Sequence, residues 1–319
     1  MNFFRKTVLI LPVLLVSKLC ALTIQFDYSL DSTGFFSGNA QAVAALNYAA
    51  SIVESTIDSN MSAIPVGGSN SYTAIFYNPS TAQYTLQIGQ SIAANTFVIY
   101  VGAGNNAVTY PDTINNDPIS HMVGGNGLSF SSSGDVGAHS GSNIFFSQLL
   151  DRNTGLVSAP WGGSISFNPN VNWSFGTTTG PGASQYDFVT QALIGINNAL
   201  GFGLSDQFNS KLNVSGDYVS NTIKPANNGS ATLSLDAGAS IYDTGNFNTV
   251  TSAGGTPQDP LMLNNLTTGE RLGYTNLDLA LMSDLGFYAA AIPEPATYGL
   301  IFGFLAIGAA FYRKHLSLR

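Results

Sequence analysis

Histidines are the first side chains in this sequence that could do chemistry. The chain has three, of which His121 and His139 lie in its central part. They are eighteen residues apart, whereas a zinc site on a helix needs two histidines one turn apart. A serine hydrolase would need one of the same histidines and a G-x-S-x-G elbow, which the sequence lacks. These patterns therefore predict neither a metal site nor another cofactor.

Carboxylates are more numerous, with seventeen between residues 22 and 288. Two of them could act as a glycosidase pair, because a sequence does not reveal how far apart they lie. Asp27 and Asp31 precede Gly34 as in a calcium loop, but Leu30 interrupts the alternation of oxygen ligands and no closing glutamate follows. We expect a turn there, and a second, glycine-based turn at 102–106.

Charge and cysteine content restrict the function further. Residues 22 to 288 carry four basic side chains against the seventeen carboxylates, a net charge of −13 that repels phosphate backbones and excludes nucleic acid as a partner. The one cysteine, Cys20, precedes this region, so disulfides are not expected within it. Short alternating apolar runs among Gly, Ser, Thr and Asn are typical of an extracellular domain with many strands.

The N-terminus has the pattern of a secretory signal peptide. Arg5 and Lys6 precede an apolar run, and the small residue Ala21 ends the segment. We expect cleavage after Ala21, and a lipid-modified Cys20 is the alternative. The predicted organisation is a signal peptide at 1–21, a secreted ectodomain at 22–288 and a second targeting segment at 289–319.

That second segment has three parts in a fixed order. Pro293, Glu294 and Pro295 are followed by an uncharged apolar stretch at 296–312, and then by Arg313 and Lys314. The apolar stretch is just long enough for a transmembrane helix, and the basic residues after it favour a cytoplasmic C-terminus. A single-pass anchor that is never cleaved would have the same general form.

The three-part order resembles the PEP-CTERM sorting signal of bacterial proteins processed by an exosortase. The resemblance implies passage through the Sec translocon, cleavage by signal peptidase, and temporary anchoring in the inner membrane. It further implies recognition of Pro293, Glu294 and Pro295 by the exosortase, and release to the cell surface or to an exopolysaccharide matrix. The basic end is weaker than the arginine cluster usual in that family.

Apolar periodicity predicts the elements of the ectodomain. Capping patterns support two of the helices, through Ser184 with Asp187 and through Thr275 with Asp278. The Gly/Ser-rich stretch Gly124–Gly141 is expected to be a long surface loop. The predicted helices are Ala40–Asp58, Ser184–Leu200 and Thr275–Leu285, and the predicted strands are Tyr72–Tyr77, Tyr84–Ile88, Phe97–Val101 and Ser164–Phe167.

The order of these elements, with Leu200-Gly201-Phe202-Gly203 after the middle helix and Met262 downstream, resembles a metzincin-type zinc protease. In that family the middle helix reads H-E-x-x-H-x-x-G and a methionine turn follows. When Gly201 is aligned with the family glycine, the three zinc-ligand positions fall on Ile194, Asn198 and Leu204, and the glutamate position falls on Gly195. Met262 matches the methionine turn. The resemblance thus implies a zincin scaffold without its zinc ligands and catalytic base.

The expected fold is α+β, a mixed sheet with a few helices, of degenerate zincin-like type; the alternative is a β-rich secreted domain. The favoured function is an exported, exosortase-processed surface or matrix protein that is not an enzyme. Two alternatives stay open. A secreted hydrolase would need paired buried carboxylates or a histidine in a cleft. A carbohydrate-binding module would need exposed aromatic side chains, for which the fourteen tyrosines and the two tryptophans, Trp161 and Trp173, are candidates.

Overall fold

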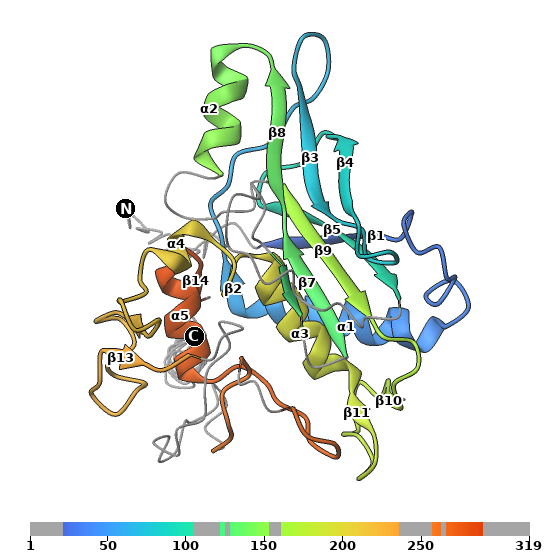
Figure 1. Cartoon of the computed structure of the whole chain (residues 1–319), viewed down its shortest axis with the longest axis vertical. Helices are drawn as coiled ribbons and strands as arrows, with labels where there is room; N and C mark the ends of the chain where they lie inside the picture. Colours follow the sequence, from blue (N-terminus) through green and yellow to red (C-terminus); the bar gives the residue numbers. More distant parts are fainter. Residues whose placement is uncertain are drawn as a thin grey trace, which may run out of the picture.

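The computed structural model of this protein describes residues 22–104, 122–124, 128–152, 161–235, 257–262 and 266–289. Over these residues the chain is an α+β protein with mixed sheets and five helices, as the sequence predicts (Figure 1). The predicted signal peptide and the predicted transmembrane stretch 296–312 lie outside the described residues. None of the described helices is both long and apolar enough to span a bilayer.

A five-stranded mixed sheet forms the centre of the fold. β1, β5 and β9 run parallel, and β7 and β6 continue the sheet with antiparallel pairing. In spatial order its strands are β1 (Thr23–Asp27), β5 (Thr96–Ala103), β9 (Gly162–Phe167), β7 (Ser129–Ser133) and β6 (Met122–Gly124).

Two hydrophobic clusters lie on the two faces of this sheet. Alternate side chains of β5 point in opposite directions, so Phe97 and Ile99 join one cluster while Val98 and Tyr100 join the other. All eight residues of β5 are buried, which explains why the strand is a continuous apolar run in the sequence.

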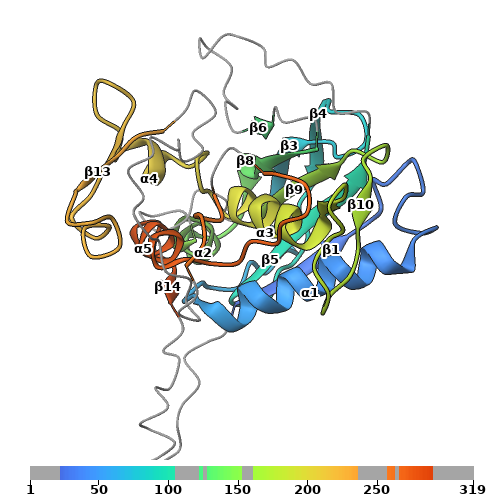
Figure 2. The ribbon, with the colours of Figure 1, turned by 90° about the horizontal axis from the view of Figure 1, so that it is seen from below.

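Helices α1 (Ala40–Thr56) and α3 (Phe188–Ala199) cover one face of the sheet and pack against each other (Figure 2). The buried face of α1 carries small side chains, since Ala42, Ala45 and Ala49 are buried while Val43 is only half-buried. The predicted end of α1 at Asp58 is wrong, because the backbone becomes extended at Ile57. Residues 57 and 58 instead form β2 (Ile57–Asp58).

A three-stranded antiparallel sheet lies against the opposite face of the central sheet (Figure 2). It consists of β4 (Tyr84–Ile88), β3 (Ser71–Tyr77) and β8 (Asp135–Ser140), in that spatial order. Tyr72, Ala74 and Phe76 of β3 pack toward Tyr100 and Trp161, and the rings of Phe76 and Tyr100 are stacked 4.5 Å apart. The opposite face of this smaller sheet carries the side chains of Tyr84, Leu86 and Ile88.

The predicted surface loop Gly124–Gly141 is wrong, because β7 and β8 lie within it. All five residues of β7 are buried although four of them are serines. Small side chains are needed here for close packing. A Cβ on Gly134 would lie 2.4 Å from the Trp161 ring and 2.5 Å from the Gly162 carbonyl oxygen. Tight packing and turn formation select the same residue types, so composition alone does not separate them.

The predicted glycine turn at 102–106 is also wrong at its start, since Gly102 lies in β5 and residues 105 and 106 are outside the described residues. Glycine is required at 102 because a Cβ there would lie 2.9 Å from the Ser80 hydroxyl. The turn expected at Asp31 is confirmed. Its carboxylate accepts hydrogen bonds from the Phe36 amide at 2.9 Å and the Thr33 hydroxyl at 2.9 Å.

Three pairs of short strands and three further helices complete the described chain. The strand pairs are β2 with β14 (Tyr288–Ala289), β10 (Trp173–Ser174) with β11 (Tyr186–Asp187), and β12 (Tyr218–Val219) with β13 (Thr232–Leu233). The helices are α2 (Asn143–Asp151), α4 (Asp206–Asn209) and α5 (Asn276–Asp284).

Side-chain caps fix where α3 and α5 begin. Asp187 caps α3 directly by accepting the Thr190 amide, so the predicted start at Ser184 is wrong and Asp187 is the cap itself. The capping box of α5, Thr275 with Asp278, is confirmed. α5 ends at Asp284 with Leu285 as its C-cap, and Gly286 follows with a φ of +89°.

Candidate functional site

The four positions aligned with a zinc motif lie on α3 and on the turn that follows it. Gly195, Asn198 and Leu204 are buried, and Ile194 packs half-buried against the core. Ile194 and Asn198 are one helical turn apart, the spacing at which two side chains share one face of a helix. Neither side chain has the imidazole nitrogen or carboxylate that zinc prefers. Ile194 presents an aliphatic group on this face, and Asn198 presents an uncharged amide.

Gly195 is where α3 approaches the sheet most tightly. A Cβ at this position would lie 2.9 Å from Ile165 Cγ2 on β9 and 3.2 Å from the Ser131 hydroxyl on β7. One turn earlier, Gln191 donates to the Ser129 hydroxyl of β7 at 2.5 Å. The position aligned with a catalytic glutamate therefore belongs to the helix–sheet interface and has no room for a side chain.

Gly201 turns the chain sharply after α3. Its φ of +114° is a conformation that favours glycine, and its carbonyl oxygen accepts the Ser205 amide at 2.9 Å. The turn brings Leu204 back into the hydrophobic core rather than to the surface. A helix followed by a glycine turn and a returning residue is therefore present, but the returning side chain is an aliphatic one.

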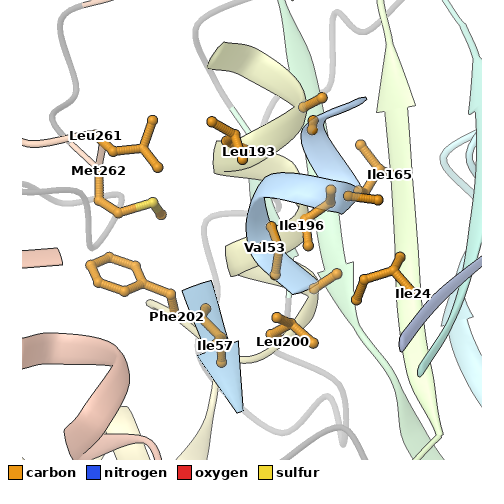
Figure 3. Packing of buried hydrophobic residues seen from close by; sticks show 14 of the residues in the cluster. Ile24, Val53, Ile57, Ile165, Leu193, Ile196, Leu200, Phe202, Leu261 and Met262 are labelled. Carbon is orange, nitrogen blue, oxygen red and sulfur yellow. The ribbon is translucent and has the colours of Figure 1, made fainter. Parts of the chain in front are cut away.

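Met262 lies beside α3. The Asn197 side-chain amide donates to the Met262 sulfur at 3.8 Å, and the Asn197 side-chain oxygen accepts from the Tyr274 hydroxyl at 2.6 Å. Figure 3 shows Leu261 and Met262 approaching α3 from the side, near Phe202. Asn197 thus joins α3 to two segments that are distant in the sequence.

Asp278 holds the same methionine segment to α5. Besides capping α5, its carboxylate accepts the amides of Leu261 at 2.9 Å and Met262 at 3.2 Å. Burial raises the pKa of this carboxyl, and the hydrogen bonds from Thr275, Leu261 and Met262 act in the opposite direction. Burial likewise raises the pKa of the neighbouring Tyr274 hydroxyl. Asp278 thus fixes the backbone of Leu261 and Met262 to α5, and Tyr274 fixes the Asn197 side chain.

An ion pair fastens the start of α3 to the segment before α5. Arg271 donates through its Nε to Asp187 at 2.9 Å and through an Nη to the other carboxylate oxygen at 2.6 Å. Asp187 is fully buried and also accepts the Thr190 hydroxyl at 2.8 Å. Arg271 further donates to the carbonyl oxygens of Gly176 and Thr177. This bidentate pair ties together three separate segments of chain.

No family model, no curated protein and no solved structure matches this chain.

Of the two central histidines, the structure describes one. His121 lies outside the described residues, whereas His139 is exposed at the end of β8, where its ring packs edge-on against Phe146. Among the residues that the structure describes, no three His, Cys, Asp or Glu side chains gather as metal ligands would. Asp187 and Asp278 are fully buried, but each is used as a helix cap.

Of the aromatic candidates for a carbohydrate platform, both tryptophans are buried, whereas Tyr48 and Tyr84 are exposed. Trp161 lies in the cluster beneath β3, and Trp173 packs on Phe167 and Phe188. The sorting residues Pro293, Glu294, Pro295, Arg313 and Lys314 lie outside the described residues. The geometry of the described chain therefore bears on the α3 positions and on Met262, and not on the sorting signal.

Several residues that hold the site together were missed by the sequence analysis. Asn197 and Arg271 have no motif around them, and their partners are 65 to 95 positions away. Away from this site, Arg152 was missed in the same way, since it is fully buried and donates to the carbonyl oxygens of Ser62 and Thr96. The scarcity of basic residues was the one available signal for the two arginines, because a rare basic side chain in an acidic sequence can be retained for a buried, paired position.

Proposed function

We propose that this protein is exported through the Sec pathway, held in the inner membrane by its C-terminal segment, and processed by an exosortase. The released ectodomain then serves at the cell surface or in an exopolysaccharide matrix as a non-catalytic protein on a degenerate zincin-like scaffold. The sorting part of this proposal rests on the sequence from Pro293 to Lys314.

One observation carries the non-catalytic part of the proposal. α3, the glycine turn at Gly201 and the Met262 segment are all present. The positions aligned with the zinc ligands and the catalytic glutamate, however, hold Ile194, Gly195, Asn198 and Leu204. Gly195 supports it most directly, because its lack of a side chain is demanded by the contact with Ile165 and Ser131. A glutamate side chain at this position would clash with β9 and β7 and would not reach a substrate. The helix has been fitted to packing and not to catalysis.

The surroundings of Met262 support descent from a zincin scaffold. The buried contact between Met262 and Asn197 places the methionine segment against α3, and Asp278 fixes that segment to the closing helix α5. The order of α3, glycine turn, methionine segment and capped last helix is the order on which the resemblance rests. These features favour a zincin origin over a fold in which α3 is an ordinary core helix.

Metal content tests the non-catalytic part. The purified residues 22–288 are expected to hold no stoichiometric zinc and to leave casein uncut. A variant with Ile194→His, Asn198→His and Leu204→His keeps Gly195 and is expected to retain about one zinc per chain after dialysis, because three imidazoles suffice for a site. The single Asn198→His variant is the control and should retain none.

Two results would contradict this expectation. Zinc or protease activity in the unchanged protein would mean that an active site exists elsewhere in the chain. A well-folded triple variant that binds no zinc would mean that positions 194, 198 and 204 do not converge, and the zincin resemblance would then be abandoned.

Cell fractionation tests the sorting part. In a bacterium that has an exosortase, the full chain is expected to be shortened and released, whereas the Glu294→Ala variant should stay full-length in the inner membrane. The matched control is Glu270→Ala, which removes a carboxylate from the ectodomain and should be processed normally. Equal processing of the Glu294→Ala variant would show that Pro293-Glu294-Pro295 is not the recognised motif.

A further inference from the structure

β4 is an open edge strand that carries three exposed apolar side chains. It pairs with β3 on one side only, and within the described residues no strand lies on its other side. Tyr84, Leu86 and Ile88 point to the same face, and their exposed fractions are 44%, 59% and 87%. An uninterrupted edge with apolar side chains is a template for pairing with another strand.

The hydrogen-bond register shows which groups this edge offers. The Gly89 amide donates to Tyr72 and the Asn78 amide donates to Gln83, so the pairs 72–89 and 78–83 are of the hydrogen-bonded type. Because that type alternates along an antiparallel ladder, Thr85 and Gln87 direct their amides and carbonyls to β3. Tyr84, Leu86 and Ile88 direct theirs outward. The same three residues thus present free backbone groups and apolar side chains.

Two other edges in the described sheets, at β1 and β8, are protected. At β1, the Ile24 amide donates to the Glu54 carboxylate at 2.7 Å, and the strand ends in Asp27. β8 contains Asp135 and His139, and its register with β3 shifts between Tyr72 and Ala74. Charges and bulges of this kind prevent unwanted strand pairing. β4 has neither, and its five residue pairs with β3 are in continuous register.

Charge does not oppose a second copy of this chain at the β4 edge. The protein is acidic, with a net charge of −8, so two copies repel each other over most of their surfaces. Residues 59–111, however, contain no charged side chain, and β3, β4 and β5 all lie in this stretch. The β4 edge is therefore a place where two copies meet without like-charge repulsion.

We propose that two copies of this protein associate through antiparallel pairing of their β4 strands, centred on Leu86. In this register Leu86 faces Leu86 of the other copy, and Tyr84 faces Ile88. All three residues with outward backbone groups then fall in hydrogen-bonded pairs, and each apolar side chain meets another. Since β8 is protected, the association closes as a two-fold dimer and does not extend into a fibre.

Sedimentation of the full chain in mild detergent tests this proposal. The unchanged protein is expected to be a dimer, and Leu86→Lys to raise the dissociation constant by about tenfold or more, because two ammonium groups would face each other across the axis. Val214→Lys is the matched control, because Val214 is fully exposed and the substitution introduces a lysine away from β4. It should remain dimeric. Circular dichroism and thermal unfolding check that both variants are folded.

Disulfide trapping tests the register. In a Cys20→Ser background, chains with Tyr84→Cys mixed with chains with Ile88→Cys are expected to form a cross-linked heterodimer on mild oxidation. Each variant alone should not cross-link, because its own cysteines would lie four residues out of register, about 13 Å apart. A monomeric unchanged protein, a dimer that Leu86→Lys leaves intact, or cross-linking of one variant alone would overturn the proposal.

Discussion

Replacing Arg271 with alanine is expected to lower the free energy of unfolding by about 3 to 5 kcal/mol, the usual effect of removing one partner from a buried charge pair. The substitution leaves the carboxylate of Asp187 fully buried, with Thr190 as its remaining donor. It also removes donors to the carbonyl oxygens of Gly176 and Thr177. Urea unfolding followed by tryptophan fluorescence measures the change.

The matched comparison uses both partners of the pair. A variant with Arg271→Ala and Asp187→Ala together is expected to lose less stability than the sum of the two single variants, because the buried charge is removed with its partner. Lys224→Ala is the control for losing a basic residue, since Lys224 is exposed and should be nearly neutral. Additive losses in the double variant would show that the two side chains contribute independently.

Replacing Gly195 with glutamate is expected to lower the free energy of unfolding by about 3 kcal/mol or more, through overpacking and burial of a carboxylate. The new Cβ would meet Ile165 Cγ2 at 2.9 Å, so α3 would have to move away from the sheet. The carboxylate would then be confined between α3 and the serines of β7. Thermal unfolding by circular dichroism measures the loss.

Two control variants separate the causes. Gly180→Glu introduces the same side chain at a site where a Cβ meets nothing within 4 Å, and it should be nearly neutral. Gly195→Ala adds only the Cβ, and its cost should be smaller because alanine gains about 1 kcal/mol of helix propensity over glycine. A Gly195→Glu variant as stable as the unchanged protein would mean that α3 moves freely, and the packing argument would fail.

The Gly195→Glu variant bears on how the proposed zincin-like scaffold would have lost its catalytic groups. If Gly195→Glu is as damaging as expected, restoring the complete motif requires changes at Ile165 or Ser131 as well. The loss of the catalytic glutamate would then have been followed by closer helix–sheet packing. A zinc site rebuilt at positions 194, 198 and 204 would remain compatible with this packing, because it leaves Gly195 unchanged.

By itself, the sequence determined the elements whose signals are local. The strand Tyr84–Ile88 was predicted at its observed bounds, and the capping box of Thr275 and Asp278 was found from spacing alone. The α+β class followed from the same periodicity. Such features depend on residues a few positions apart, where backbone geometry fixes which side chains can meet. The sorting signal is also a local pattern, and it stays a prediction.

Tertiary structure decided everything that depends on contacts between distant segments. β7 had the composition of a loop, yet its serines are buried, and α3 packs so closely on them that a Cβ on Gly195 would lie 3.2 Å from the Ser131 hydroxyl. Asn197 and Arg271 looked ordinary until the fold placed Met262 and Asp187 beside them. The open edge of β4 is likewise a product of the fold, because β3 pairs with β4 on one side and no described strand pairs with it on the other. Close packing joins residues by distance in space, and a linear sequence does not record that distance.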